Sequence, residues 1–242
     1  MAKEFGDNPT KQDRVHIPFG PQLLETHMTT EQLSLLKELA NKVFSLSDEE
    51  KQKHDSRDKL AGAIAEEYTL KTFLSSNDPK AITILDMLIQ GCCKYHNYAV
   101  RMNRISNTSN LPLEEIPFDI ALKCFKITDV WINYQQKEEY NPLHNHFGDY
   151  SMTGYIDIPY KLEDEHKLKH QGSPTKTAGN ISFVNASSHH LSPGEMTASP
   201  EEGMMLFFPS LLLHQVFPFY TSDKPRISIA ANFLFDKNIE QK

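Results

Sequence analysis

Short strand-like runs, separated by turns rather than by helices, dominate the second half of the chain. They are rich in β-branched and aromatic residues, and Pro, Gly, Asn and Ser cluster between them. Because no helix-length segment intervenes, the pattern favours an antiparallel sandwich or jelly roll over a parallel α/β sheet. The runs lie at 125–134, 151–158, 180–184, 204–208 and 226–235.

The first half predicts helices instead. Thr29 and Gln32 form a capping-box pattern ahead of apolar residues at helical spacing, and a second periodic stretch covers 79–103. A short apolar run at 15–19 suggests an edge strand, and the polar stretch 161–178 suggests a mobile loop that covers a site. We therefore predict a single domain of the α+β class, mainly β, with a flexible arm over 1–14, a mainly helical support region over 15–120 and a β core over 121–242.

Composition narrows the class of function. The net charge of −7 argues against a broad nucleic-acid surface, which requires clustered Lys and Arg. No run reaches the roughly 20 apolar residues that cross a bilayer, and the polar N-terminus does not resemble a secretory signal. Three cysteines, two of them adjacent, predict neither disulfides nor a zinc site. We expect a cytoplasmic protein with small-molecule partners, and the sequence carries no signal for its oligomeric state.

Three of the eleven histidines stand apart. His144 and His146 are two positions apart, so in an extended segment both imidazoles face the same side and could chelate one ion. His214 could complete a set of three from a distant strand. A metal that activates oxygen needs three protein ligands and open positions, and two histidines with one carboxylate are the usual set for non-haem iron.

Arg226 lies twelve residues after His214, in a run where Arg226, Ser228 and Asn232 share one face of a predicted strand. An arginine that faces the interior of a sandwich needs an anion, because an unpaired buried charge is costly. Its planar fork matches a carboxylate, and the Ser228 hydroxyl could add a hydrogen bond.

These residues form an ordered series that resembles the 2-oxoglutarate and iron(II)-dependent oxygenase superfamily, particularly its poorly characterised members. The resemblance runs from about Trp131 to Phe233. It implies a double-stranded β-helix, a jelly-roll (cupin-like) core with N-terminal supporting helices. The series consists of Trp131-Ile132-Asn133-Tyr134, His144-x-His146, Tyr155, Gly203, Phe208-Pro209-Ser210, His214 and Arg226-x-Ser228.

The resemblance also implies a ligand set. The iron ligands of the family are a His-x-Asp/Glu pair and a distal histidine, which fall on His144, position 146 and His214. Position 146 is histidine here, so the site has three histidines, two histidines and a water, or a carboxylate from Asp149. We favour the three histidines and keep Asp149 as the alternative third ligand.

For the cosubstrate, the resemblance assigns Arg226 and Ser228 to the distal carboxylate of 2-oxoglutarate and Tyr155 beside them. Asn133, Tyr134 and Asn232 could line the same pocket. The implied cofactors are Fe(II), 2-oxoglutarate and O2, and the implied reaction couples decarboxylation to succinate with hydroxylation of an unidentified substrate. The alternatives are a cupin-like metal-dependent hydrolase or isomerase, which has no need of Arg226, and a non-catalytic metal and 2-oxoglutarate sensor.

Overall fold

The computed structural model describes residues 20–57, 62–74, 77–106, 115–169, 172–173, 176–185 and 194–236, and the backbone of 14–16. Within 77–106, side chains are described only as far as residue 102. Residues 1–13 of the predicted arm and 17–19 of the predicted edge strand lie outside this part. The elements are β1 Arg14–His16, β2 Leu23–His27, α1 Thr30–Phe44, α2 Asp48–His54, β3 Glu67–Thr69, α3 Pro79–Ser106, η2 Phe118–Ile120, α4 Ala121–Cys124, β4 Phe125–Gln135, β5 Asn141–His144, β6 Tyr150–Asp157, α5 Leu162–Glu165, β7 Ile181–Val184, β8 Glu195–Ala198, β9 Met204–Pro209, β10 Leu213–Val216 and β11 Arg226–Phe235.

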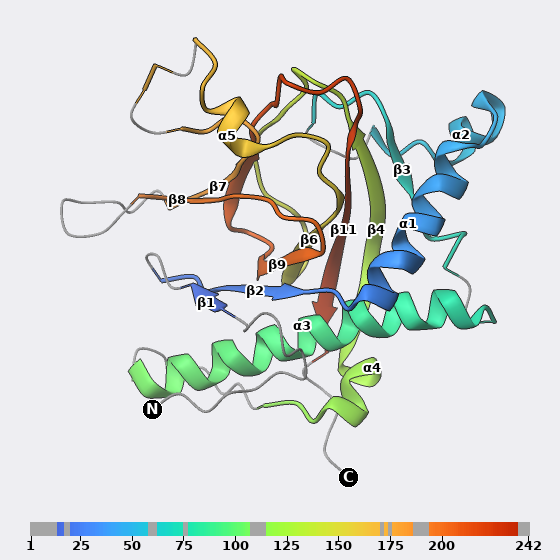
Figure 1. Ribbon diagram of the computed structural model, residues 1–242. Coiled ribbons are helices and arrows are strands. Elements are labelled where there is room, and N and C mark those ends of the chain that lie inside the picture. The colour runs from blue at the N-terminus through green and yellow to red at the C-terminus, as the bar shows by residue number, and fades with distance from the viewer. Residues whose placement is uncertain are drawn as a thin grey trace.

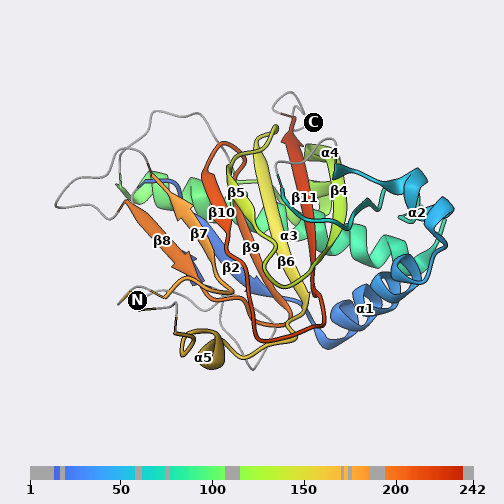
Figure 2. The ribbon, with the colours of Figure 1, turned by 90° about the horizontal axis from the view of Figure 1, so that it is seen from above.

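Two antiparallel sheets face each other. The larger has the order β1-β2-β9-β6-β11-β4-β3 and the smaller β5-β10-β7-β8. Figure 2 shows the four strands of the smaller sheet side by side, with the larger sheet behind them. Strands β4, β6, β9 and β11 lie in the larger sheet and β5, β7, β8 and β10 in the smaller one, all from the predicted core region 121–242, as in a double-stranded β-helix. The predicted fold, a jelly-roll core with N-terminal helices, is confirmed.

Helices cover the outer face of the larger sheet, as Figure 1 shows for α1 and α3. Helix α1 begins at the predicted capping box, in which Thr29 and Gln32 satisfy each other's backbone N–H groups. Its Leu36 and Val43 are fully buried against the outer face of the sheet, together with the apolar residues of α3. The helical prediction therefore holds, although strands β2 and β3 from the same region also join the sheet.

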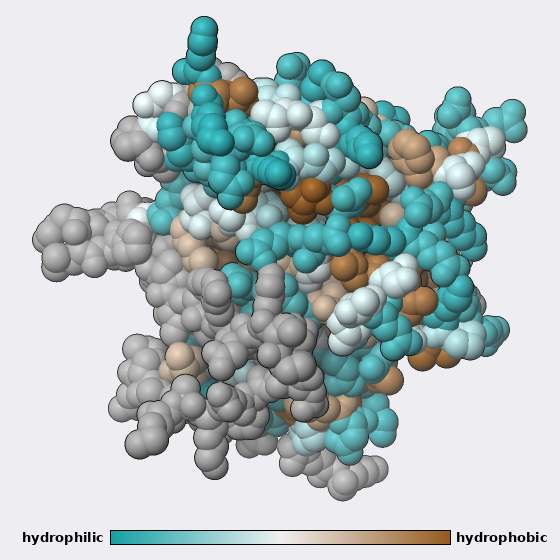
Figure 3. All heavy atoms as spheres, viewed as in Figure 1, coloured by the Kyte–Doolittle hydropathy of each residue, from teal (hydrophilic) through white to brown (hydrophobic). Residues whose placement is uncertain are grey.

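A second apolar cluster lies between the sheets and includes Tyr155, Phe183 and Phe208. Beside this cluster lies a pocket that is lined by both polar and apolar side chains. On the outside, hydrophilic residues cover most of the coloured surface in Figure 3, with scattered hydrophobic patches. Among the described residues, none of the helices is both long and apolar enough to cross a membrane.

The stretch predicted as a mobile loop, 161–178, is anchored at its start. It contains the short helix α5, whose Glu165 is fully buried. The Glu165 carboxylate accepts hydrogen bonds from the backbone N–H groups of Tyr220 and Thr221, both at 2.8 Å. These bonds attach the start of the loop to the β10–β11 connection.

Candidate metal centre

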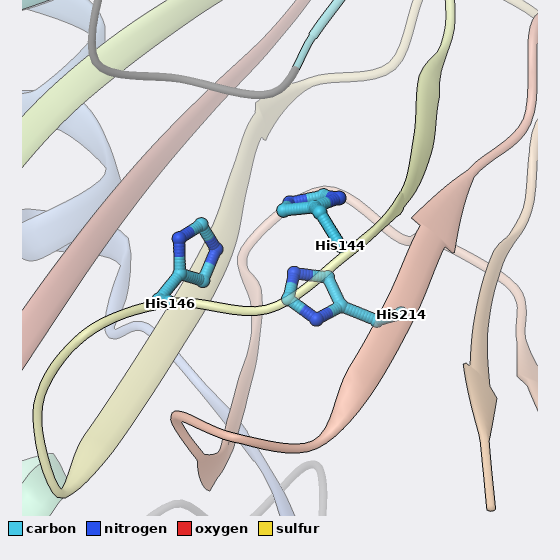
Figure 4. A group of neighbouring side chains, drawn as sticks. All are labelled: His144, His146 and His214. Atoms are coloured by element: carbon cyan, nitrogen blue, oxygen red, sulfur yellow. The ribbon is translucent and has the colours of Figure 1, made fainter. Parts of the chain in front are cut away.

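Three imidazoles meet at the inner side of the smaller sheet. His144 ends β5 and lies directly opposite His214 on β10, while His146 follows in the next turn. The ring centroids are 4.2 Å apart for His144 and His214, and 5.0 Å from each of these to His146. Figure 4 shows the three rings pointing toward one another. One ligand atom from each histidine lies within 4.8 Å of the others, so a single ion can contact all three.

Backbone carbonyls fix the orientation of two of the rings. His144 Nδ1 lies 2.6 Å from the carbonyl of Pro142, and His214 Nδ1 lies 2.9 Å from that of Leu212. Each Nδ1 must carry the proton to donate to a carbonyl, which leaves Nε2 as a free lone pair. A hydrogen bond of this kind is the usual support for a metal-binding histidine.

The site keeps its histidines uncharged. Burial lowers the pKa of His214 to about 3 and that of His146 to about 4, with the neighbouring histidines adding to the effect. Burial also lowers the pKa of His144. All three imidazoles are therefore neutral near pH 7, the form that binds a cation without first losing a proton.

Asp149, the predicted alternative ligand, does not join this group. Its Oδ2 accepts a hydrogen bond from the backbone N–H of Phe235 at 2.8 Å, and the side chain is exposed. Within the part of the chain that the structure describes, the three histidines are the one cluster of His, Cys, Asp or Glu with metal-binding geometry. The turn 147–149 carries Asp149 away from the pocket because it returns the chain to the larger sheet.

The inner face of the larger sheet forms the opposite wall of the pocket. Strand register places Glu67 beside Asn133, Asn133 beside Ser228, and Ser228 beside Tyr155. Cross-strand neighbours share a face, so these four side chains form one row across β3, β4, β11 and β6. All four line the same pocket as the three histidines.

Arg226 lies one row further along β11 and is 1% exposed. Its Nη1 donates to the Tyr160 hydroxyl and the Gly179 carbonyl, both at 2.7 Å, and its Nη2 donates to Gln135 Oε1 and more weakly to the Phe217 carbonyl. Every one of these partners is neutral. Among the described residues, no carboxylate pairs with Arg226.

Unsatisfied polar atoms mark the same pocket. The Tyr155 hydroxyl and Asn133 Oδ1 are buried and make no hydrogen bond to a described residue, while Asn133 Nδ2 donates to Ser228 Oγ at 3.3 Å. Buried polar atoms without partners are uncommon in folded proteins and call for a water, an ion or a ligand. A guanidinium that has only neutral partners among the described residues, together with these hydroxyl and amide groups, fits a dicarboxylate, and three neutral imidazoles fit a divalent transition-metal ion.

Two predicted pocket residues face elsewhere. Tyr134 follows Asn133 on β4, so its side chain points to the other face of the sheet, where its hydroxyl donates to the Ala40 carbonyl of α1 at 2.6 Å. Asn232 shares the inner face but lies beyond the pocket, and its Oδ1 accepts a hydrogen bond from Ser151 at 2.7 Å. Neither Tyr134 nor Asn232 therefore lines the pocket, and the hydrogen bonds of both side chains stabilise the fold.

Three residues were missed by the sequence analysis. Gln135 holds Arg226 across the β4–β11 ladder, and the alternation that selects Asn133 also selects Gln135. Tyr160 binds Arg226 from the connection after β6, and Glu67 comes from β3, a strand of three residues. No local pattern identifies Tyr160 or Glu67, because their positions depend on strand pairing between distant segments.

Comparisons with known proteins find one family model and several solved structures to which the chain is similar. Residues 129–232 match a family model described as "Putative 2OG-Fe(II) oxygenase". The non-heme alpha ketoglutarate dependent epimerase SnoN from nogalamycin biosynthesis is similar in structure, with 9% identity, a TM-score of 0.50, and coverage of 88% of this chain and 78% of that one. A Pseudomonas putida prolyl-4-hydroxylase gives 12% identity, a TM-score of 0.48, and coverage of 88% and 92%. Among curated proteins, no sequence matches the chain.

Proposed function

We propose that the chain acts as a 2-oxoglutarate and iron(II)-dependent oxygenase, the family of oxidoreductases whose model matches residues 129–232, and that it oxidises a primary substrate at the expense of 2-oxoglutarate. Hydroxylation is the expected outcome. The proposal assigns the metal to His144, His146 and His214, and the cosubstrate to the wall formed by the larger sheet.

The three histidines would hold the iron through two Nε2 atoms with fixed lone pairs and a third imidazole from the following turn. When bound, iron and 2-oxoglutarate together supply the oxidising chemistry, with succinate and carbon dioxide as co-products. A third neutral ligand in place of a carboxylate leaves the metal centre one unit more positive. This higher positive charge favours anionic partners in the remaining coordination positions.

The cosubstrate assignment rests on Arg226, whose unpaired buried charge is the observation that carries the proposal. A desolvated guanidinium with neutral partners alone is costly to bury, and a carboxylate ligand would remove that cost. Its partners Tyr160, Gln135 and Gly179 would hold the fork in place, while the Tyr155 and Ser228 hydroxyls could donate to the same carboxylate. Tyr155 remains a neutral donor, because burial raises its pKa.

The same observation separates the oxygenase from its rivals. A metal-dependent hydrolase with three histidines would leave Arg226 without an anion, whereas a 2-oxoglutarate enzyme gives it one. A sensor that binds iron and 2-oxoglutarate without turnover would share both sites, so only the formation of succinate distinguishes the two.

The experiment measures succinate from anaerobically iron-loaded protein after addition of 2-oxoglutarate and oxygen. We expect His214→Ala to abolish turnover, because it removes a metal ligand. Arg226→Ala is expected to weaken 2-oxoglutarate binding by at least roughly thirtyfold, the effect of losing one partner of a buried charged pair.

His54→Ala and Arg101→Ala are matched controls, since both residues lie outside the pocket and contact Thr72 and Glu115. Both should behave as wild type. Equal succinate from the wild type and from the His214 and Arg226 variants would refute the proposal.

A further inference from the structure

Glu67 is a buried carboxylate that the proposed chemistry does not use. The side chain is 1% exposed and lines the metal pocket from the edge strand β3. Its Oε2 is buried and makes no hydrogen bond to any residue that the structure describes. A buried charge without a partner is among the most costly features of a folded protein, so this carboxylate requires an explanation.

A second unsatisfied acceptor lies beside it. Asn141, at the start of β5, also lines the pocket, and its Oδ1 is buried without a hydrogen-bond partner in the described part of the chain. Gly62 lies against both groups: a Cβ added there would be 2.0 Å from Asn141 Oδ1 and 3.5 Å from Glu67 Oε1. The absence of a side chain at residue 62 thus leaves two oxygen acceptors close together at one edge of the pocket.

The charges around Glu67 are mainly negative. Its pKa is raised to about 7, first by burial and then by the carboxylates of Glu139 and Asp55, while Arg57 acts in the opposite direction. Arg57 is itself engaged with Asp55 through Nε at 3.0 Å and Nη2 at 2.5 Å. The other charged or titratable groups lining the pocket are Arg226, the neutral histidines and Tyr155, whose pKa is raised by burial so that it stays neutral. A cation at this edge would therefore be attracted by Glu67 and by its acidic neighbours.

Two acceptors, one of them anionic, define the complementary ligand as a group that donates several hydrogen bonds and carries a positive charge. We propose that Glu67 and Asn141 form a subsite for a protonated nitrogen of the primary substrate, an amine or a guanidinium. This inference rests on the proposed function for the identity of the pocket, and it names the class of substrate. Glu67 lies on the edge strand β3, whereas Arg226 lies on β11, on the other side of β4. The pocket would therefore bind an anion and a cation at separate places.

Trp131 supplies the measurement. It is the one tryptophan of the chain, it lines the pocket, and its ring centroid lies 5.5 Å from that of His146. Its fluorescence therefore reports on ligands that enter. The probes are n-butylammonium and n-butylguanidinium, with n-butanol and butyrate as neutral and anionic analogues. Each probe is titrated into the full chain, with and without 2-oxoglutarate and zinc. Zinc replaces iron in this experiment because it binds imidazoles and has no redox chemistry.

We expect both cations to bind at least about tenfold more tightly than n-butanol, the range of a charge-assisted hydrogen bond. Glu67→Gln should abolish this preference while keeping the size and shape of the side chain. Glu66→Gln is the matched control, because the adjacent Glu66 instead contacts Lys51 and Tyr68 and does not line the pocket. It should retain the preference.

A second variant covers the case in which Glu67→Gln fails to fold. Gly62→Ala keeps the carboxylate but adds a methyl group that would displace the Asn141 side chain, and should weaken cation binding at least about fivefold, since the site loses one acceptor and room for the ligand. A tripeptide amide with a central lysine, an acetylated N-terminus and a free side-chain amine tests the source of the nitrogen. Tighter binding than n-butylammonium indicates a protein side chain, and weaker binding indicates a small metabolite.

Equal affinities of n-butylammonium and n-butanol in the wild type would overturn the subsite, as would a cation preference that survives Glu67→Gln. Failure of the proposed function has a different signature, namely no response of Trp131 to zinc or 2-oxoglutarate. The amine titration of the unloaded protein still decides the subsite in that case.

Discussion

The pocket contains two buried charges that the fold treats in opposite ways. Arg226 is surrounded by four hydrogen-bond acceptors drawn from β4, from the chain after β6 and from the segment before β11. Glu67, on the edge strand β3, has an oxygen with no partner at all among the described residues. The comparison indicates that the guanidinium is held in place before any ligand arrives, whereas the carboxylate is left to be satisfied by one.

The largest effect is expected from Arg226→Met, which keeps the volume but removes every donor. The acceptors on Tyr160, Gln135 and Gly179 would lose buried hydrogen bonds worth about 1–3 kcal/mol each, so we expect a loss of at least about 3 kcal/mol in the free energy of unfolding. Urea denaturation measures it. A variant as stable as wild type would mean that the guanidinium is not a structural anchor.

Glu67→Gln should raise the free energy of unfolding instead of lowering it, and the size of this gain should depend on pH. Because burial raises the pKa of Glu67 to about 7 from its usual 4.5, the folded protein holds a proton that the unfolded chain releases between these values. Stability is therefore lost as pH rises from about 4.5 to about 7, by up to roughly 3 kcal/mol from this group.

The variant lacks this loss. It should match the wild type near pH 5 and exceed it in stability near pH 8, as measured by denaturation at the two pH values. A stability difference that does not change with pH would show that Glu67 is not an unpaired buried acid.

Gln135→Glu tests whether Arg226 lacks an anion of its own. A carboxylate at this position would pair with the guanidinium across the β4–β11 ladder and compete with the cosubstrate. We expect 2-oxoglutarate affinity to fall at least about tenfold, a change of roughly 1.4 kcal/mol in the free energy of binding. Thermal stability should not fall. Unchanged affinity by calorimetry would remove Arg226 from the cosubstrate site.

The smallest effect is expected from Asp149→Asn. Asp149 is a carboxylate outside the pocket and serves as a comparison with the two buried charges inside it. Metal affinity should stay within about twofold of wild type, since Asp149 lies outside the histidine cluster. The side-chain carbonyl oxygen of Asn can still accept the hydrogen bond from the Phe235 backbone N–H, so stability should change by less than about 1 kcal/mol. A large loss of metal affinity would restore Asp149 as a ligand.

The parts of the site that were predictable from sequence are those governed by local periodicity. His144 and His146 were selected because side chains two residues apart share a face of an extended segment, and the same rule selected Arg226 and Ser228. The assignment of both Asn133 and Tyr134 to the pocket ignored this rule, since adjacent strand residues point to opposite faces. Strict alternation would have replaced Tyr134 with Gln135.

Other features depend on pairing between distant segments, which no single stretch encodes. Strand β3 places Glu67 beside Asn133 through a ladder of three residues, and its short length gives no recognisable alternation. Tyr160 and Gly179 reach Arg226 from either end of the stretch that composition marks as a loop. The helix α1, by contrast, follows from its own capping box and apolar spacing, so its prediction was correct.

The attachment of β5 has a consequence for how the protein opens. This strand lies at the border of its sheet and pairs with β10 at two positions, His144 with His214 and Asn141 with Val216. A cation shared by His144 and His214 would cross-link the two strands at one of these positions, so removing it with a chelator should loosen β5 first. Amide hydrogen exchange along 141–146 would then accelerate, while exchange in the other strands stays slow. A bound metal would therefore stabilise the edge of the smaller sheet in addition to its part in the chemistry.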